Sequence, residues 1–153
     1  MFSEDNEKNI IIAPNFAIGA VLMMEFSKKA AKYMDDVEII ELHHDQKIDS
    51  PSGTSIRTAE LINENFTKNA DDKKNYIESL SGARGAQKNG VNIHSIRLKG
   101  LVAHQEVIFG AEGQSLSIKH DSYDRSSFMP GVAMAIDKID QVSNLVYGLE
   151  NIL

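Results

Sequence analysis

The hydrophobic positions change their period along the chain, and each change marks an expected element. Residues 10–13 form a continuous apolar run, which predicts a short, buried parallel strand. Over residues 17–34 the apolar side chains recur at steps of three and four, which predicts a long amphipathic helix. Residues 37–42 are rich in β-branched side chains and roughly alternate, so they predict a strand that delivers His43 and His44 to its carboxyl end.

The middle of the chain combines turn chemistry with a helix start. The run Ser52-Gly53-Thr54 precedes helically spaced apolar residues, so Ser52 or Thr54 is the expected N-cap. The free amides of such a helix start form a natural anion site. Residues 68–74 are charged and residues 81–90 are rich in glycine, which predicts a mobile surface connection.

The rest of the chain predicts strands and then helix. Three strands are expected, at residues 91–98, 103–111 and 116–120, with a tight turn at 112–114. The short connections between these strands predict antiparallel pairing. Residues 127–139 and 142–153 have helical spacing, although Pro130 and Gly131 blur the start of the first segment.

Composition narrows the possible functions. The 153 residues are 42% hydrophobic, which is enough for the core of one domain. The net charge of −6 disfavours nucleic acid and anionic membranes as partners, because both need a basic surface. The longest apolar run, residues 17–24, is too short to span a bilayer. The absence of cysteine excludes disulfides and thiolate chemistry, and it fits a cytoplasmic location.

One cationic cluster stands out in this acidic chain. His43, His44 and Lys47 lie at the end of a predicted strand, just before the predicted helix start. Three interpretations remain open: a solvated loop, a metal site that adds Asp45 and Asp49, or a clamp for a small dicarboxylate with a proton donor beside it. Neighbouring histidines on a strand point to opposite faces, which makes joint metal ligation awkward.

The order of residues in this region resembles a known family. The run from Glu41 to Thr54 is similar to the dihydrodipicolinate reductase signature Glu-x-His-His-x-x-Lys-x-Asp-Ala-Pro-Ser-Gly-Thr, and only Ser50 departs from it. Residues 13–19 resemble that family's crossover between its nucleotide and substrate domains. A segment near the end resembles its His-x-x-x-x-Arg-x-x-Phe-x-x-Gly pattern, at His120, Arg125, Phe128 and Gly131.

The resemblance implies a role for each matching residue. His43 would be the general acid and Lys47 a second proton donor, while a nicotinamide supplies hydride to the substrate ring. The implied substrate-binding residues are His44, Lys47, Ser52, Gly53 and Thr54. The implied cofactor-binding residues are Ala13, Pro14, Asn15, Phe16 and Arg125. No metal is implied, and the cofactor would be NADPH or NADH.

The resemblance also implies a fold and a domain organisation. We expect an α+β fold with a mixed β-sheet flanked by helices, the substrate-binding and tetramerisation domain of a two-domain Rossmann-type reductase. Residues 1–16 would be a crossover strand and hinge, 17–125 the substrate-binding and oligomerisation domain, and 126–153 a helical segment that packs on the nucleotide domain. No Gly-x-Gly-x-x-Gly loop is present. We therefore expect a C-terminal part of a longer enzyme that is inactive by itself.

Other chemistry-bearing residues have ordinary interpretations. We expect His94, His104 and His120 to be packed or surface histidines, and Arg84 to belong to a solvated linker. Two alternative functions remain from the residues alone. The first is a non-catalytic module that binds a small dicarboxylate, and the second is a metal-dependent hydrolase.

Overall fold

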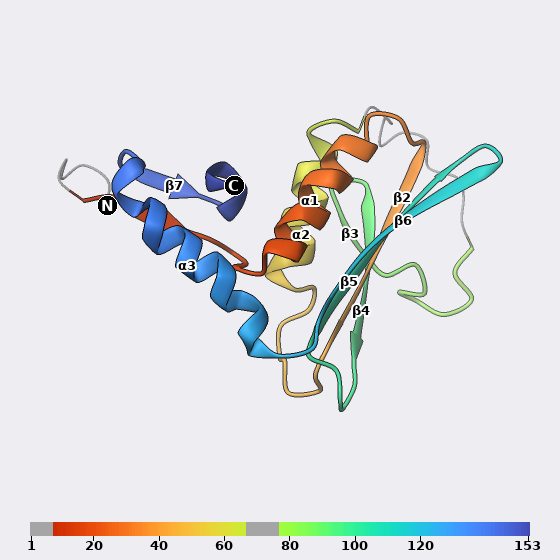
Figure 1. Ribbon diagram of the computed structural model, residues 1–153. Coiled ribbons are helices and arrows are strands. Elements are labelled where there is room, and N and C mark those ends of the chain that lie inside the picture. Colours follow the sequence, from red (N-terminus) through yellow and green to blue (C-terminus); the bar gives the residue numbers. More distant parts are fainter. Residues whose placement is uncertain (1–7, 67–76) are drawn as a thin grey trace.

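A five-stranded mixed sheet forms the centre of the protein. The computed structural model describes residues 8–66 and 77–153, and its main sheet has the order β3-β4-β2-β5-β6 (Figure 1). The strands are β2 (Asp36–His43), β3 (Ala86–Lys88), β4 (Val91–Arg97), β5 (Ala103–Ala111) and β6 (Gln114–Ser122). Strands β2 and β4 run parallel, and the other neighbours run antiparallel. The expected α+β fold with a mixed sheet is therefore confirmed.

Two helices cover one face of this sheet. Helix α1 (Ile18–Ala30) and helix α2 (Gly53–Asn63) lie side by side on that face in Figure 1. The core beneath them comes from alternate strand positions, because every second side chain of a strand points to the same side. Among these, Ile39 of β2, Val107 and Phe109 are fully buried. Helix α1 ends earlier than predicted.

Ser52, one of the two predicted N-cap residues, is the N-cap of helix α2. Its Oγ accepts a hydrogen bond from the backbone N–H of Ser55 at 3.2 Å. This bond satisfies one of the amides that a helix start leaves without an intrahelical partner. The start of α2 is thereby fixed next to the end of strand β2.

The predicted strands are confirmed, but one predicted pairing is wrong. β5 and β6 form the expected antiparallel hairpin, and Gly113 takes a left-handed φ of 73° in its turn. β4 and β5 do not pair with each other, because β2 lies between them. The short connection from β4 to β5 suggested direct pairing, yet two apolar strands gain more burial by flanking the buried β2.

The glycine-rich connection also differs from its prediction. Residues 86–88, within the predicted mobile segment 81–90, form strand β3 and pair antiparallel with β4. Backbone hydrogen bonds to β4 form this strand, because its side chains, Ala86, Gln87 and Lys88, have little of the apolar or β-branched character typical of strands. Gly85 permits this close approach, because a Cβ there would lie 2.5 Å from the carbonyl oxygen of Ile93. The charged residues 68–74 lie outside the described part of the chain.

The two ends of the chain meet in a second, smaller sheet. Strand β1 (Ile10–Ile12) pairs in parallel with β7 (Leu145–Tyr147), so the predicted first strand is confirmed. It is only partly buried, however, and Ile12 is 47% exposed. Helix α3 (Met129–Lys138), close to its predicted position, lies beside this small sheet (Figure 1).

The predicted helix over residues 142–153 is wrong. This stretch contains β7 and the 3₁₀ helix η3 (Leu149–Ile152), separated by Gly148 at a φ of 95°. Two further 3₁₀ turns, η1 (Arg125–Phe128) and η2 (Ile139–Gln141), flank α3. A strand of three residues whose partner lies at the other end of the sequence leaves no local periodicity to detect. Within residues 8–66 and 77–153, no helix has the length and apolar character needed to cross a membrane.

Candidate active site

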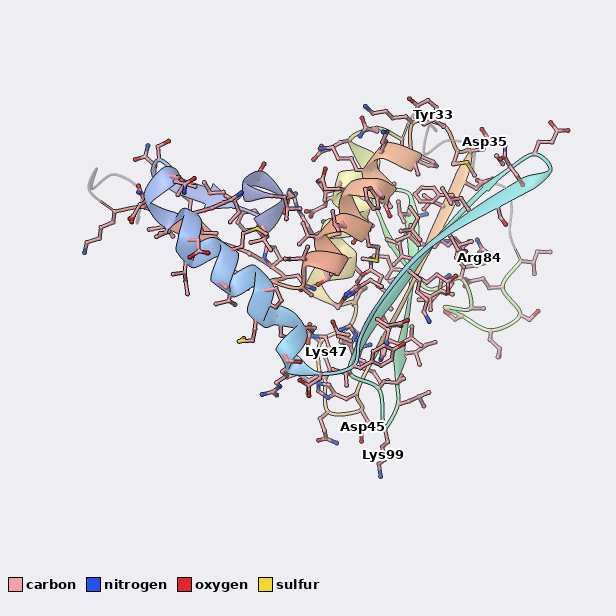
Figure 2. All side chains as sticks on the ribbon, in the orientation of Figure 1. Tyr33, Asp35, Asp45, Lys47, Arg84 and Lys99 are labelled. Atoms are coloured by element: carbon pink, nitrogen blue, oxygen red, sulfur yellow. The ribbon has the colours of Figure 1, made fainter. Side chains whose placement is uncertain are left out.

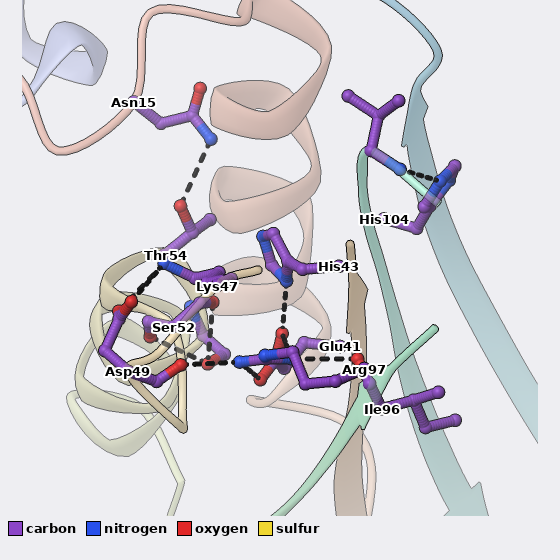
Figure 3. A network of polar contacts seen from close by, with 12 residues as sticks. Asn15, Glu41, His43, Lys47, Asp49, Ser52, Thr54, Ile96, Arg97 and His104 are labelled. Atoms are coloured by element: carbon purple, nitrogen blue, oxygen red, sulfur yellow. Dashed lines mark hydrogen bonds and ion pairs between the residues drawn. The ribbon is translucent and has the colours of Figure 1, made fainter. Parts of the chain in front are cut away.

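A small polar cavity lies where strand β2 ends and helix α2 begins. Four of the predicted site residues line it: Asn15, His43, Ser52 and Thr54. Asn15 belongs to the segment before α1, and its side-chain amide donates to the Thr54 hydroxyl oxygen at 3.1 Å (Figure 3). The structure therefore joins the predicted cofactor-binding segment to the predicted substrate-binding segment, although they are far apart in the sequence.

Strand β2 positions His43 through its pleat. His43 is the last residue of the strand, and it follows Val37, Ile39 and Glu41 on the face covered by the helices. Its Nδ1 atom lies 2.5 Å from Oε2 of Glu41 (Figure 3). The side chain is only 15% exposed, so this histidine occupies a largely desolvated position at the cavity wall.

Glu41 is a charged residue at a core position. Glu41 is completely buried, and the Arg97 guanidinium of β4 donates hydrogen bonds to both of its carboxylate oxygens at 2.8 and 2.9 Å. Burial by itself would raise the pKa of Glu41, but hydrogen bonds from His43, Arg97 and Ser95 outweigh it and lower that pKa to about 2. The carboxylate is therefore ionised at neutral pH. We call Glu41, His43 and Arg97 the inner cluster.

A second cluster of the same residue types occupies the other face of strand β2. Glu38 contacts Arg84 and lies 2.7 Å from Nε2 of His94. Its side chain is 34% exposed. We call Glu38, Arg84 and His94 the outer cluster. The predicted linker residue Arg84 thus reaches a carboxylate of its own chain, and Figure 2 shows it well away from Lys47.

The structure does not bring every predicted residue to the cavity wall. Lys47 lies in the loop after β2, where its Nζ binds both carboxylate oxygens of Asp49 at 2.7 and 2.8 Å. This contact lowers the pKa of Asp49. Lys47 and Asp45 both lie at the end of the sheet where β2 stops (Figure 2). His44 is exposed beside them.

The helix start offers two amides to a ligand. Gly53 and Thr54 are the first residues of α2, and the Ser52 cap bonds to the amide of Ser55 instead. Among the described residues, no hydrogen-bond partner is recorded for the backbone N–H of Gly53 or Thr54. Gly53 is exposed, and a Cβ there would meet nothing within 4 Å. A carboxylate could approach these amides directly.

The remaining predicted cofactor residues surround the hinge rather than the cavity. Phe16 lines a separate apolar groove with residues of α3. Gly131 of α3 packs against the Phe16 backbone, since a Cβ at Gly131 would come within 1.9 Å of the Phe16 carbonyl oxygen. Arg125 is exposed at the start of η1, and Ala13 and Pro14 precede Asn15 without lining the cavity.

Several cavity residues were not predicted from the sequence. Gln105 and Ser122 line the wall, as do His104 and His120, which the sequence analysis treated as packed or surface residues. Burial lowers the pKa of His120. His104 is held by Asp121 at 2.8 Å. Glu41 had one local signal, because it is a carboxylate at the inward position of an alternating apolar strand.

The metal-site interpretation finds no support in the described geometry. Across residues 8–66 and 77–153, no group of three or more histidine, aspartate or glutamate side chains is placed to hold a metal ion. Nδ1 of His43 is directed at Glu41, and Asp49 is bound to Lys47. His43 and Asp49, two of the four residues of the proposed metal set, are therefore held by other side chains of the chain.

The fold is an α+β domain with a small cavity where strand β2 ends and helix α2 begins. Residues 19–153 match the family model described as "Dihydrodipicolinate reductase, C-terminus". The chain therefore belongs to the dihydrodipicolinate reductase family, and the expectation drawn from the Glu41–Thr54 run is confirmed.

Individual relatives agree with this family. The chain is 60% identical, over 99% of its length, to the 4-hydroxy-tetrahydrodipicolinate reductase of Listeria welshimeri, and 57% identical to that of Bacillus mycoides. It covers 57% of each of these proteins, so it spans little more than half of their length. A dipicolinate-bound dihydrodipicolinate reductase from Paenisporosarcina sp. TG-14 has a TM-score of 0.86 and 55% identity, over 95% of this chain and 55% of that one.

Proposed function

We propose that this chain forms the substrate-binding and proton-donating part of a 4-hydroxy-tetrahydrodipicolinate reductase. The reaction reduces 4-hydroxy-tetrahydrodipicolinate to tetrahydrodipicolinate with NAD(P)H, in the biosynthesis of diaminopimelate and lysine. One observation carries the proposal: the cavity that contains His43 also contains Ser52 and Thr54 at the start of helix α2. A proton donor and a carboxylate site thus share one small space. The relatives' names support the same reaction.

The substrate's carboxylates would bind at the helix start and at the loop beside it. The Gly53 and Thr54 amides suit one carboxylate, with the Ser52 cap holding the helix start in place. Lys47 and the exposed His44 suit the other. Lys47 now binds Asp49, so we propose that a substrate carboxylate replaces Asp49 as its partner.

The proton would come from His43. This histidine lies at the cavity wall, and Glu41 holds its Nδ1 atom, which leaves Nε2 to donate a proton to the substrate. In the transfer, the Nε2–H bond breaks and a C–H bond forms on the substrate, with the N–H electron pair returning to the imidazole ring. Lys47 would be the second donor.

The nicotinamide cofactor, NADH or NADPH, would supply the hydride. Asn15 supports the approach of the cofactor to this cavity, because it lines the same cavity as His43 and donates a hydrogen bond to Thr54. Ala13, Pro14, Phe16 and Arg125 would contribute from the surrounding hinge and from η1. In their described positions these residues do not form a phosphate-binding loop.

We also propose a homotetramer in the cytoplasm. The sheet face opposite α1 and α2 carries side chains that are only partly buried, Ile40 and Ile108 among them, and such a surface suits self-association through the sheet. The absence of cysteine fits a reducing compartment. Residues 126–153, with α3 and the β1–β7 pair, would pack on a nucleotide-binding domain, while residues 17–125 form the substrate-binding domain and residues 1–16 the crossover.

Calorimetric titration with dipicolinate tests the proposed site in the chain by itself. We expect saturable binding with one site per chain, and at least about tenfold weaker binding of picolinate, which lacks one carboxylate. Equal affinity for both compounds would contradict the two-carboxylate clamp. Turnover would then be measured after fusion to the nucleotide-binding half of the Listeria relative. Dipicolinate binding without turnover in that fusion would favour the alternative, a non-catalytic dicarboxylate-binding module.

A further inference from the structure

Glu41 occupies a position that a carboxylate takes only at considerable cost. Strand β2 points Val37, Ile39 and Glu41 toward the helices, and Glu41 is as inaccessible as Ile39, at 0% exposure. An isolated buried carboxylate becomes protonated rather than remain charged. Glu41 remains charged because the Arg97 guanidinium donates hydrogen bonds to both of its oxygens, so its position calls for a functional or structural reason.

The bidentate hydrogen bonds from Arg97 fix the orientation of the Glu41 carboxylate. The two guanidinium nitrogens of Arg97 bind the two carboxylate oxygens of Glu41 at 2.8 and 2.9 Å, and parallel contacts of this kind restrict both side chains (Figure 3). The oxygen Oε2 of Glu41 then faces Nδ1 of His43 at 2.5 Å. An ionised carboxylate only accepts hydrogen bonds, so Nδ1 of His43 must carry the proton.

This arrangement fixes which nitrogen of His43 is available for chemistry. With Nδ1 protonated and directed at Glu41, the neutral ring holds its lone pair on Nε2. Figure 3 shows the far side of the ring turned away from Glu41, toward the side of Asn15 and Thr54. Those two residues line the cavity together with His43. Nε2 is therefore the atom that exchanges a proton with a bound ligand.

Arg97 also connects Glu41 to the loop that carries Lys47. Its Nη2 atom donates to the backbone carbonyl of Asp49 at 2.8 Å, and its Nη1 atom donates to the carbonyl of Ile96 at 2.9 Å. Asp49 in turn holds Lys47. One guanidinium thus touches both the carboxylate that orients His43 and the loop that orients Lys47.

We propose that Glu41 and Arg97 are positioning residues that set His43 in the Nδ1–H tautomer, with Nε2 toward the cavity, and that hold the Lys47 loop beside it. The catalytic consequence rests on the proposed function, whereas the tautomer does not. During proton transfer the Nε2–H bond breaks and the substrate C–H bond forms, while the Nδ1 proton stays with His43 and Glu41. The hydride comes from the nicotinamide cofactor, and the substrate's 4-hydroxyl group leaves as water with a hydrogen of the neighbouring carbon, so atoms and electrons balance.

Nitrogen-15 NMR of the histidine rings tests the tautomer without any variant. At a pH where His43 is neutral, we expect its Nδ1 to resonate as a protonated nitrogen and its Nε2 as an unprotonated one. The exposed His44, for which no ring partner is recorded among the described residues, is the internal comparison. A neutral His43 whose proton resides on Nε2 would overturn the proposal.

Two matched variants then separate positioning from general stability. Glu41→Gln keeps the size of the side chain and removes the charge, and Glu38→Gln makes the same change in the outer cluster. We expect Glu41→Gln to change the tautomer of His43 and leave that of His94 unaltered, and Glu38→Gln to do the reverse. If Glu41→Gln does not fold, Arg97→Lys is tested in its place, because lysine keeps the positive charge but cannot form the bidentate hydrogen bonds to Glu41.

Kinetics of the two-domain fusion complete the test. We expect Glu41→Gln to lower kcat by about 100-fold with KM changed less than about threefold, because the proton donor is misplaced while the carboxylate sites remain. Equal, small effects of Glu41→Gln and Glu38→Gln on kcat would overturn the positioning role. If wild-type His43 has the expected tautomer but the chain does not bind dipicolinate, the proposed function fails and the tautomer assignment stands.

Discussion

Strand β2 carries two glutamates, three residues apart, that each hold an arginine and a histidine. The inner cluster, built on Glu41, faces helices α1 and α2, and the outer cluster, built on Glu38, faces the opposite side of the sheet. Their residue types are identical, but the Glu41 side chain is 0% exposed and that of Glu38 is 34% exposed. Electrostatic contacts are stronger where water is excluded. Burial, rather than the residue types, therefore distinguishes the two clusters.

The two clusters also differ in what they connect. The outer cluster connects the backbone segments around β2, β3 and β4 on the partly exposed face of the sheet. In the inner cluster, by contrast, Nδ1 of the histidine is held by Glu41 and the far side of the ring faces a cavity (Figure 3). Only that geometry suits chemistry on a bound molecule. Four predictions test whether the comparison holds.

The largest difference should appear in turnover. Replacing His43 by alanine in the two-domain fusion should lower kcat by about 10²- to 10⁴-fold, because the reaction would lose its general acid. Replacing His94 by alanine should change kcat less than about threefold. Steady-state assays of cofactor oxidation would measure both variants. Comparable losses at the two positions would remove the functional distinction between the clusters.

Stability should separate the two glutamates. Glu41→Ala leaves the Arg97 guanidinium, whose side chain is only 17% exposed, without its carboxylate, and loss of one partner of such a largely buried pair costs about 3 kcal/mol of the free energy of unfolding. Glu38→Ala breaks a partly exposed pair and should cost about 1 kcal/mol or less. Urea denaturation followed by circular dichroism measures both. Similar losses for the two variants would show that burial is not the decisive difference.

The pH dependence of stability should belong mainly to the inner cluster. The pKa of Glu41 is about 2 in the folded chain, compared with its ordinary value of 4.5. A lowered carboxyl pKa stabilises the folded chain above pH 4.5, and that stabilisation, about 3 kcal/mol at most, disappears as the pH falls from 4.5 toward 2. Glu41→Gln should flatten this part of the stability profile. A Glu41→Gln profile that falls as steeply as that of the wild type over this pH range would contradict the assignment to Glu41.

Ligand affinity should show the smallest of the four differences. Lys47 sits in the loop that Arg97 anchors, and Lys47→Ala should weaken dipicolinate binding by about 10- to 100-fold through the loss of one charged contact. Lys88 of strand β3 is the matched control, because it forms an ion pair with Glu60 of helix α2 and not with a residue of the proposed site. Its side chain is 43% exposed. Calorimetric titration should find Lys88→Ala within about twofold of wild type. A matching loss there would point to a nonspecific charge effect.

Much of the site could be predicted from neighbouring residues in the sequence. The strand that ends at His43 and the cap at Ser52 follow from alternation and from capping chemistry, and both are confirmed. The partner of Glu41 could not be predicted in the same way. Arg97 reaches it only because β4 runs parallel to β2, with His43 opposite Arg97 in the register. Neither strand contains information on that register.

The wrong predictions share one cause. The position of β2 between β4 and β5, and the pairing of β1 with β7, both join segments that are distant in the sequence. Local periodicity indicates what a segment becomes but not which segment it meets. Strand β7 and strand β3 are each three residues long, and neither has the continuous β-branched run that marks β1. Their conformation depends on the partner strand.

The sequence by itself determined the family, the main helices and strands, and the cationic run that begins at Glu41. These are local properties, set by side-chain spacing, turn chemistry and residue order. The tertiary structure decided which of two identical clusters is buried and which faces solvent. That choice depends on the face of β2 that α1 and α2 cover, because covering it removes water from Glu41 and leaves Glu38 partly exposed. Water is excluded only when the helices pack on the sheet, and this exclusion strengthens the electrostatic contacts of the inner cluster.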